Sequence, residues 1–221
     1  MLGIFVLLAL GTWQLDRLFQ KEHLITERQA ALKLPPVDLT SHTDVANLPV
    51  PRRVTVAGRF QHTRELRVGP RSRRGRIGWQ VITPLKLAGG RTVLVDRGWV
   101  PESKKDPGSR QETAVAGAVA LAGFVQKSRK PGWFTPDNDP PKGNWYWVDP
   151  VAMATYLDME DRFPFWIVAA RQEINRGLPI GIDHLAMPAN NHLQYAITWF
   201  GLAFALAGVA FAYWRRSAAP D

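Results

Sequence analysis

The sequence predicts an α+β membrane protein in which two terminal transmembrane helices flank a mostly antiparallel β domain, built as a small barrel or a sandwich on the extracytoplasmic side. Three observations predict this class. Each end of the chain carries a long apolar run without formal charge, the long middle is polar, and apolar residues in that middle alternate with a period of two. The 221 residues leave room for one ordinary domain beside the two spans.

The second predicted span covers residues 191–214 and is followed by a cytoplasmic tail at residues 215–221. Between Leu193 and Trp214 the chain carries no formal charge, and this stretch reaches about 33 Å as a helix, enough to cross a bilayer core of about 30 Å. The aromatic pair at its end suits the membrane interface, and the two arginines that open the tail suit a positive-inside anchor. The C-terminus is therefore expected in the cytoplasm.

The first predicted span covers residues 1–16 and continues as an amphipathic helix over residues 17–34. The uncharged run MLGIFVLLALGTWQL measures about 22 Å as a helix, short of the roughly 30 Å needed, so we expect the span to begin further upstream. Trp13 and Gln14 mark the membrane interface. A cleaved signal peptide is the alternative, although no basic segment precedes the run and no clear A-x-A site follows it.

The domain between the spans is expected at residues 35–190, outside the membrane, with both termini in the cytoplasm. Four prolines between Pro35 and Pro51 suit a connecting segment, and the apolar period then changes to two. Strands are predicted at residues 52–60, 78–87, 91–100, 114–126, 144–148 and 165–170, and a short helix at residues 150–157.

The composition excludes several kinds of site. The chain has no cysteine, which excludes disulfides, zinc ribbons and thiol-based copper or redox chemistry. No G-x-S-x-G elbow, HExxH motif, dinucleotide fingerprint or P-loop is present, and the acidic residues show no spacing that specifies a catalytic pair. The sequence therefore predicts a protein that is not an enzyme.

The net charge of +9 includes a dense arginine run. An external domain meets little nucleic acid but always lies close to anionic headgroups, so membrane lipids are the expected partner and nucleic acid is not. The run is interpreted as a solvated loop beside the membrane, with binding of carboxylate or propionate groups as the alternative. Its members are Arg64, Arg67, Arg71, Arg73, Arg74 and Arg76.

Four sequence blocks resemble the surfeit-locus family of cytochrome c oxidase assembly factors, called Shy proteins in yeast. They are LGTWQLDR ending at Arg17, GRFQHTREL at residues 58–66, VLVDRGWVP at residues 93–101 and NNHLQYAITWFGL at residues 190–202. The blocks occur in the family's order between two terminal spans, so the resemblance covers nearly the whole chain. The absence of an Arg-rich transit peptide favours a bacterial member over a mitochondrial precursor.

This resemblance implies a non-catalytic helper in the biogenesis of haem–copper oxidases, acting around insertion of haem a into subunit I. It implies haem a as the cargo, His192 as its axial iron ligand, and oxidase subunit I and haem a synthase as partners. The expected location is the bacterial cytoplasmic (inner) membrane, with the central domain in the periplasm. A haem-free scaffold that holds an oxidase assembly intermediate is the alternative function.

His192 lies where haem ligation is physically reasonable. A neutral imidazole is a good ligand for haem iron, and a bilayer interface lets the macrocycle lie in hydrocarbon while its propionates reach water or cations. His192, Tyr195, Ala196 and Trp199 share one helix face at i, i+3, i+4 and i+7, so the aromatic rings could wall a ligand plane. The alternative is an interfacial histidine that caps the helix or bonds to headgroups, beside aromatic residues that need no cofactor. In either case the two preceding asparagines are expected to cap the helix.

Arg17 and Lys21 leave the membrane on the same outer side as His192. They could meet haem propionates if the two helices pack together, with snorkelling toward headgroups as the alternative. Gly201 and Gly208 are expected to permit close approach of the first helix. Arg97 is expected to pair with Asp96 or Asp149 inside the β domain, and the remaining histidines are interpreted as surface or capping residues. These histidines are His23, His42, His62 and His184.

Overall fold

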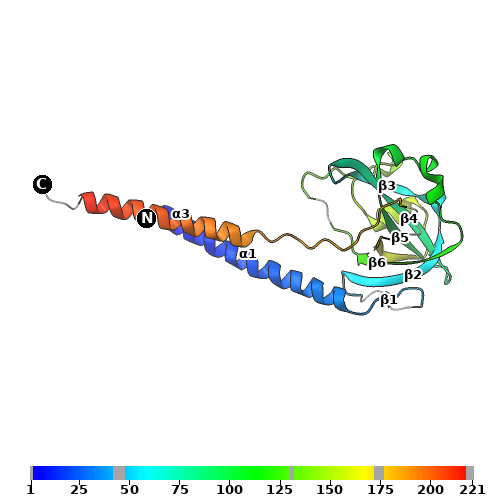
Figure 1. The fold of residues 1–221 in the computed structure, drawn as a ribbon, viewed down its shortest axis with the longest axis horizontal. Helices are drawn as coiled ribbons and strands as arrows, with labels where there is room; N and C mark the ends of the chain where they lie inside the picture. Colours follow the sequence, from blue (N-terminus) through cyan, green and yellow to red (C-terminus); the bar gives the residue numbers. More distant parts are fainter. Residues whose placement is uncertain (1, 42–47, 130–131, 172–176, 218–221) are drawn as a thin grey trace. The chain divides into compact units, whose positions relative to one another are not determined.

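A computed structural model describes residues 2–41, 48–129, 132–171 and 177–217 of the chain (Figure 1). Parts of the predictions above lie outside these residues, namely position 1 of the first span, positions 218–221 of the tail, and His42. The chain divides into two compact units, a helix pair formed by residues 1–30 and 186–221 and a β domain formed by residues 31–185.

The helix pair consists of α1 (Leu2–Lys33) and α3 (His192–Ser217), each long and apolar enough to cross a membrane. The first span and its predicted helical continuation over residues 17–34 form one continuous helix, which ends at Lys33. The two helices are antiparallel, because residues early in α1 face residues late in α3 and the reverse. Gly3 lies against Leu206, and Gln14 lies against His192.

The glycine that allows the helices to pack closely is Gly11. A Cβ atom built at Gly11 would lie 2.7 Å from the Phe200 ring, so any side chain there would displace the ring. The prediction that Gly201 and Gly208 serve this purpose is wrong, since no atom lies within 4 Å of a Cβ built at either position among the described residues. Ala196 and Ala203 are the buried residues of α3.

The β domain is a mixed sheet that closes on itself (Figure 1). The strand order is β1-β2-β6-β7-β5-β4-β3, and a further pairing of β2 with β4 closes a barrel of five strands. Most pairs are antiparallel, whereas β1–β2 and β5–β7 are parallel. The strands are β1 (Val37–Asp38), β2 (Arg52–Phe60), β3 (Leu66–Arg73), β4 (Arg76–Leu87), β5 (Thr92–Pro101), β6 (Ala118–Gln126) and β7 (Arg162–Ala169).

The barrel forms because alternate residues of its strands are apolar and fill one core. Val54 and Val56 of β2, Val93 and Val95 of β5 and Ile167 of β7 all point into this core. The sequence prediction of an α+β membrane protein with a mostly antiparallel β domain is confirmed, and of its two architectures the strand pairings give the barrel.

A second cluster covers the outside of β5. The short helix α2 (Pro150–Tyr156) places Met153 and Ala154 against Ile82 and Leu94, so β5 is buried on both faces. Asp149 caps this helix by accepting bonds from the first two backbone N–H groups that follow Pro150, each at 3.1 Å. The predicted helix at residues 150–157 is thus present.

Two local predictions are wrong. Residues 144–148 do not form a strand, because the Asn138 side chain binds the backbone of Tyr146 and Trp147 and leaves Trp145 to plug the second cluster. The arginine run is not a loop but spans η1 (His62–Arg64) and the β3–β4 hairpin. Leu66 and Val68 alternate into the core and fix that strand.

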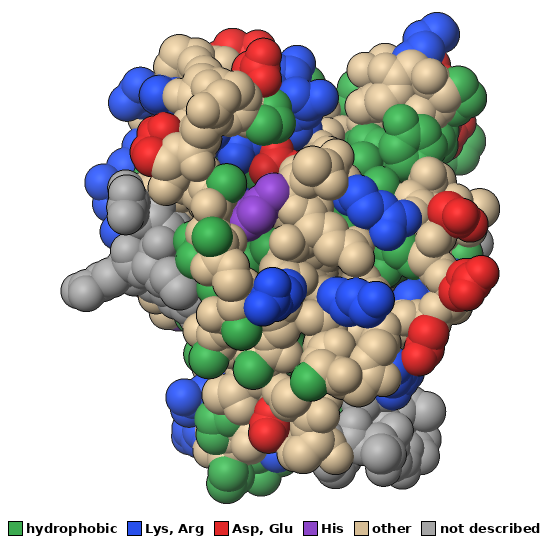
Figure 2. All heavy atoms as spheres, turned by 90° about the vertical axis from the view of Figure 1, so that its right-hand side faces the viewer, with side chains coloured by type: hydrophobic (Ala, Val, Ile, Leu, Met, Phe, Trp, Pro, Cys, Tyr) green, Lys and Arg blue, Asp and Glu red, His purple; other side chains and the backbone are tan. Residues whose placement is uncertain are grey.

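Three further 3₁₀ segments connect the strands. They are η2 (Glu102–Lys104), η3 (Pro107–Thr113) and η4 (Pro140–Lys142). The first two follow β5 directly and carry part of the buried polar network described below. Figure 2 looks onto the β domain, where cationic and anionic side chains are interspersed with neutral and hydrophobic ones.

Candidate functional site

His192 is the first residue of α3, and the preceding asparagine fixes the chain there. Asn190 Oδ1 accepts a hydrogen bond of 3.4 Å from the His192 backbone N–H, which is the capping that the sequence predicts. The amide nitrogen of Asn190 donates to the Leu18 carbonyl oxygen of α1 at 3.3 Å. The start of α3 is therefore held both to its own cap and to the neighbouring helix.

The His192 imidazole is oriented by a glutamine of α1. His192 Nδ1 lies 2.7 Å from Gln14 Oε1. An amide oxygen only accepts, so Nδ1 must carry the hydrogen and the lone pair of the neutral ring lies on Nε2. Gln14 is buried within the helix pair, and the bond joins residues 178 positions apart in the sequence.

The aromatic residues predicted beside His192 lie along the outside of α3. Tyr195 is exposed, Trp199 is half-buried, and Ala196 between them packs against α1. The small residue is therefore buried within the helix pair. His192 itself is half-buried.

The two predicted cations of α1 lie after Gln14 at helical spacing. Arg17 donates to Gln20 Oε1 at 2.9 Å, and its guanidinium lies 5.7 Å from the Trp13 ring centroid. Lys21 is half-buried. Neither contacts His192 in the described part of the chain. His192 is hydrogen-bonded to Gln14, and Arg17 is bonded to Gln20 of its own helix.

The site as described offers one nitrogen donor. Across residues 2–41, 48–129, 132–171 and 177–217, no group of three or more His, Asp or Glu side chains is arranged to hold a metal ion. A single oriented imidazole suits a planar metal complex that supplies its own equatorial ligands better than it suits a bare ion. The sequence alone predicts Gln14 only as a residue of the membrane interface. The signal that identifies it is a polar amide within an apolar helix.

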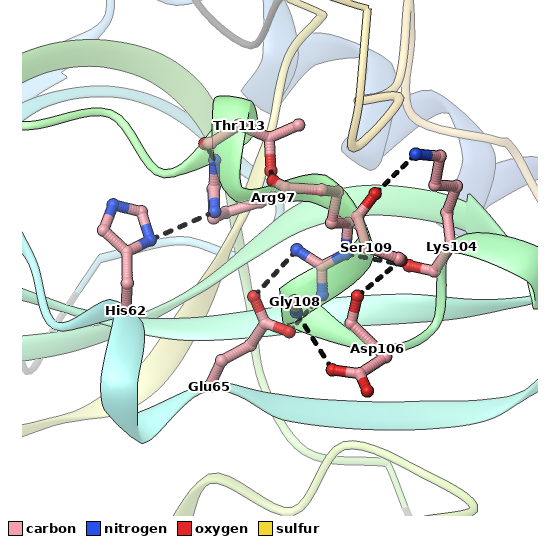
Figure 3. A network of polar contacts seen from close by, with 9 residues as sticks. His62, Glu65, Arg97, Lys104, Asp106, Gly108, Ser109 and Thr113 are labelled. Carbon is pink, nitrogen blue, oxygen red and sulfur yellow. Dashed lines mark hydrogen bonds and ion pairs between the residues drawn. The ribbon is translucent and has the colours of Figure 1, made fainter.

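The β domain contains a separate buried polar network (Figure 3). Arg97 of β5 is almost fully buried and donates to the Thr113 carbonyl oxygen at 2.6 Å and toward His62 Nδ1 at 3.3 Å. The predicted pairing of Arg97 with Asp96 or Asp149 is wrong. Because Arg97 is the extra residue of a β-bulge opposite Val81 and Ile82, its side chain turns toward η1 and η3.

A buried ion pair completes this network. Glu65 binds Arg110 of η3 through both carboxylate oxygens, and the two side chains are only 4% and 2% exposed respectively. Burial lowers the pKa of Arg97 to about 10, so it too is charged at neutral pH. Two buried cations thus share one carboxylate.

His62 belongs to this network and is not the surface or capping residue that the sequence suggests. Its Nε2 lies 3.0 Å from the Val115 carbonyl oxygen and must carry the hydrogen, which leaves Nδ1 to accept from Arg97. A second ring proton would face the Arg97 N–H groups. Burial, aided by the charge of Arg97, accordingly lowers the pKa of His62.

The lowered pKa of His62 predicts a pH dependence of folding. Below the ordinary value of 6.5 the unfolded chain takes up a proton that the folded chain resists, so the contribution of His62 to stability is lost as pH falls. His62→Gln keeps one donor and one acceptor but does not titrate. We expect its free energy of unfolding, from denaturant titrations between pH 5 and 8, to fall less on acidification than that of the wild type.

The pH dependence of stability must be compared between variants, because Asp96 changes the stability of every variant with pH in the direction opposite to His62. Burial raises the pKa of Asp96 to about 7, so its contribution to stability is lost as pH rises from 3.8 toward 7. His184→Gln, at an exposed histidine of the same domain, serves as the control and should keep the wild-type profile. Equal profiles for His62→Gln and wild type would contradict the assignment.

The chain is similar to proteins of one family over nearly its whole length. The family model described as the SURF1 family matches residues 1–204. A SURF1-like protein of Monosiga brevicollis is 37% identical over 211 residues, which cover 90% of this chain and 79% of the relative. Surfeit locus protein 1 of Homo sapiens is 35% identical, covering 94% and 74%, and a SURF1-like protein of Rickettsia felis is 32% identical, covering 96% and 93%.

Proposed function

The chain belongs to the SURF1 family, and on this premise we propose that it is a non-catalytic assembly factor for a haem–copper terminal oxidase. In this proposal it binds haem a as cargo at the outer membrane interface and assists its insertion into oxidase subunit I. Two helices of membrane-spanning length at the ends of the described chain are consistent with a two-pass membrane protein.

The observation that supports haem binding most directly is the hydrogen bond between His192 and Gln14. Histidines that ligate metals commonly donate their second ring N–H to an oxygen, which fixes the tautomer and the ring orientation. Gln14 Oε1 lies 2.7 Å from His192 Nδ1 and would accept this bond, which leaves the Nε2 lone pair for iron. This orientation of the ring supports His192 as the proposed axial ligand.

The neighbouring residues receive roles that follow from where they lie. Tyr195 and Trp199 would cover a face of the macrocycle along α3. Arg17 and Lys21 would meet the propionates. The bond from Arg17 to Gln20 is exposed to solvent, so the guanidinium can exchange that amide for a carboxylate at small cost.

The proposed location is the bacterial inner membrane, with both termini in the cytoplasm and the β domain in the periplasm. Arg215 and Arg216 end α3 and would lie on the cytoplasmic side. Oxidase subunit I would be the acceptor and haem a synthase the donor. A single protein ligand suits transfer, because a closed site with two ligands would hold its cargo more tightly.

The test is the haem content of the full chain purified in detergent from a host that makes haem a. We expect near-stoichiometric haem and a Soret band in the wild type, and loss of most of both in His192→Ala. Gln14→Met keeps the volume but removes the acceptor, so we expect haem affinity to fall by about 10- to 100-fold. Haem content by pyridine haemochrome and the Soret spectrum measure these effects.

His23→Ala is the matched control, because His23 is an exposed histidine of α1. It should retain wild-type haem, and all variants should show unchanged thermal unfolding. A haem-free wild type would favour the alternative function, a membrane scaffold for an assembly intermediate. An undiminished haem content in His192→Ala would show that another residue ligates the iron.

A further inference from the structure

The largest exposed aromatic surface of the described β domain is a pair of adjacent residues in the segment after β6. Trp133 and Phe134 are each 96% exposed. The other large apolar side chains exposed in the described part of this domain are markedly more covered, the most exposed being Ile77 at 64%. Soluble proteins rarely expose two neighbouring aromatic rings without contacts, because exposing apolar surface to water is unfavourable.

The backbone holds this pair at the tip of a turn. The Thr135 N–H donates to the Gly132 carbonyl oxygen at 2.9 Å, which makes Trp133 and Phe134 the two central residues of a β-turn. At this position both side chains are almost fully exposed. We call residues 132–135 the aromatic turn.

The charges around the aromatic turn include exposed cations. Lys127 and Arg129 precede it and are exposed. On the other side Asp137 is exposed, whereas Asp139 is paired with Lys142 at 2.9 Å. The surroundings of the two rings therefore carry a small excess of positive charge, which complements an anionic surface.

We propose that the aromatic turn inserts into the outer lipid interface and so anchors the β domain on the bilayer. Tryptophan and phenylalanine beside lysine and arginine form the combination that favours the headgroup region. The bilayer is also the surface that the domain meets constantly, since the chain continues from both ends of the domain into membrane helices. The inference rests on the proposed membrane placement and is independent of haem.

The test uses the absence of cysteine from the chain, which allows one label at a chosen position. Phe134→Cys and Ile77→Cys are made in the full chain, labelled with an environment-sensitive fluorophore, and reconstituted in vesicles of phosphatidylcholine with phosphatidylglycerol. Nitroxide lipids labelled near the headgroup should quench the probe at position 134 about threefold more than the probe at position 77. Replacing Lys127 and Arg129 by Gln should reduce this difference.

A second probe leaves both rings in place. A label on Ser128→Cys should be shielded in vesicles, and the shielding should be lost when Trp133 and Phe134 are both replaced by Ser. Equal quenching at positions 134 and 77, or shielding that arises only when purified oxidase subunit I is added, would overturn the proposal; the latter result would make the turn a protein-docking site. Because no haem is used, failure here is distinguishable from failure of the haem test.

Discussion

Gly98→Ala is expected to cost the β domain about 4 kcal/mol of folding free energy, most of what a marginally stable domain possesses. Gly98 has a φ of +125°, a conformation that strains any residue with a side chain. A Cβ atom there would also lie 2.2 Å from the Ile180 carbonyl oxygen and 2.5 Å from the Gly181 nitrogen. These are backbone atoms, so the whole segment would have to move.

The movement would break a specific pairing. Trp99 donates its backbone N–H to Ile180 at 3.0 Å and accepts from the Ile180 N–H at 2.8 Å. Denaturant titration of the full chain in detergent, followed by tryptophan fluorescence, would measure the loss, since Trp99 and Trp145 are buried in this domain. Much of the variant should be unfolded at 37 °C.

Gly89→Ala provides the control for this substitution. Gly89 lies between β4 and β5 of the same domain, and no described atom lies within 4 Å of a Cβ built there. Its substitution should change stability by no more than about 0.5 kcal/mol. A Gly98→Ala variant as stable as Gly89→Ala would contradict the prediction, because it would show that the backbone at Ile180 can move aside without loss of folding free energy.

Glu65→Gln is expected to destabilise the β domain by about 3 to 5 kcal/mol, because it leaves two buried cations without a counter-charge. Arg110 loses its bidentate carboxylate, and Arg97 loses the negative charge of Glu65, which favours its charged form. Arg97 is already incompletely hydrogen-bonded, since its buried Nε has no partner among the described residues. The same denaturant titration measures the effect.

The matched control exchanges a carboxylate for an amide in an exposed pair. Asp183 binds Arg171 at 2.7 Å, but its side chain is 58% exposed. Asp183→Asn should therefore change stability by at most about 1 kcal/mol. If both variants lost equal stability, burial would not be the cause. A double variant, Glu65→Gln with Arg110→Met, should recover part of the loss by removing one unpaired cation.

The candidate site shows where sequence reasoning succeeds and where it stops. His192 and the cap by Asn190 could be predicted, because both follow from residue types at the start of an apolar helix. Gln14 could not be joined to His192, since the two lie 178 residues apart and their contact depends on how the two helices pack. Gly11 was missed for the same reason, as the close approach at Phe200 depends on the rotation of α3.

The β domain shows the same division. The period of two predicted β2 closely, and the strand-like residues of 91–100 predicted β5, because both signals are local properties of the sequence. The sequence did not predict the parallel pairing of β5 with β7 or the closure of β2 onto β4, which depend on long-range register. The bulge that turns Arg97 onto His62 and Thr113 is likewise invisible in the DRG motif itself.

The sequence by itself determined the two terminal apolar helices, the β-rich middle, the family and the histidine at the start of α3. Each depends on local composition or on blocks of neighbouring residues. Only the tertiary structure decided which residue orients His192, which carboxylate neutralises Arg110, and which glycine lets the helices meet. Those contacts join residues far apart in the chain, and their free energy depends on burial and distance, which arise only when the chain packs.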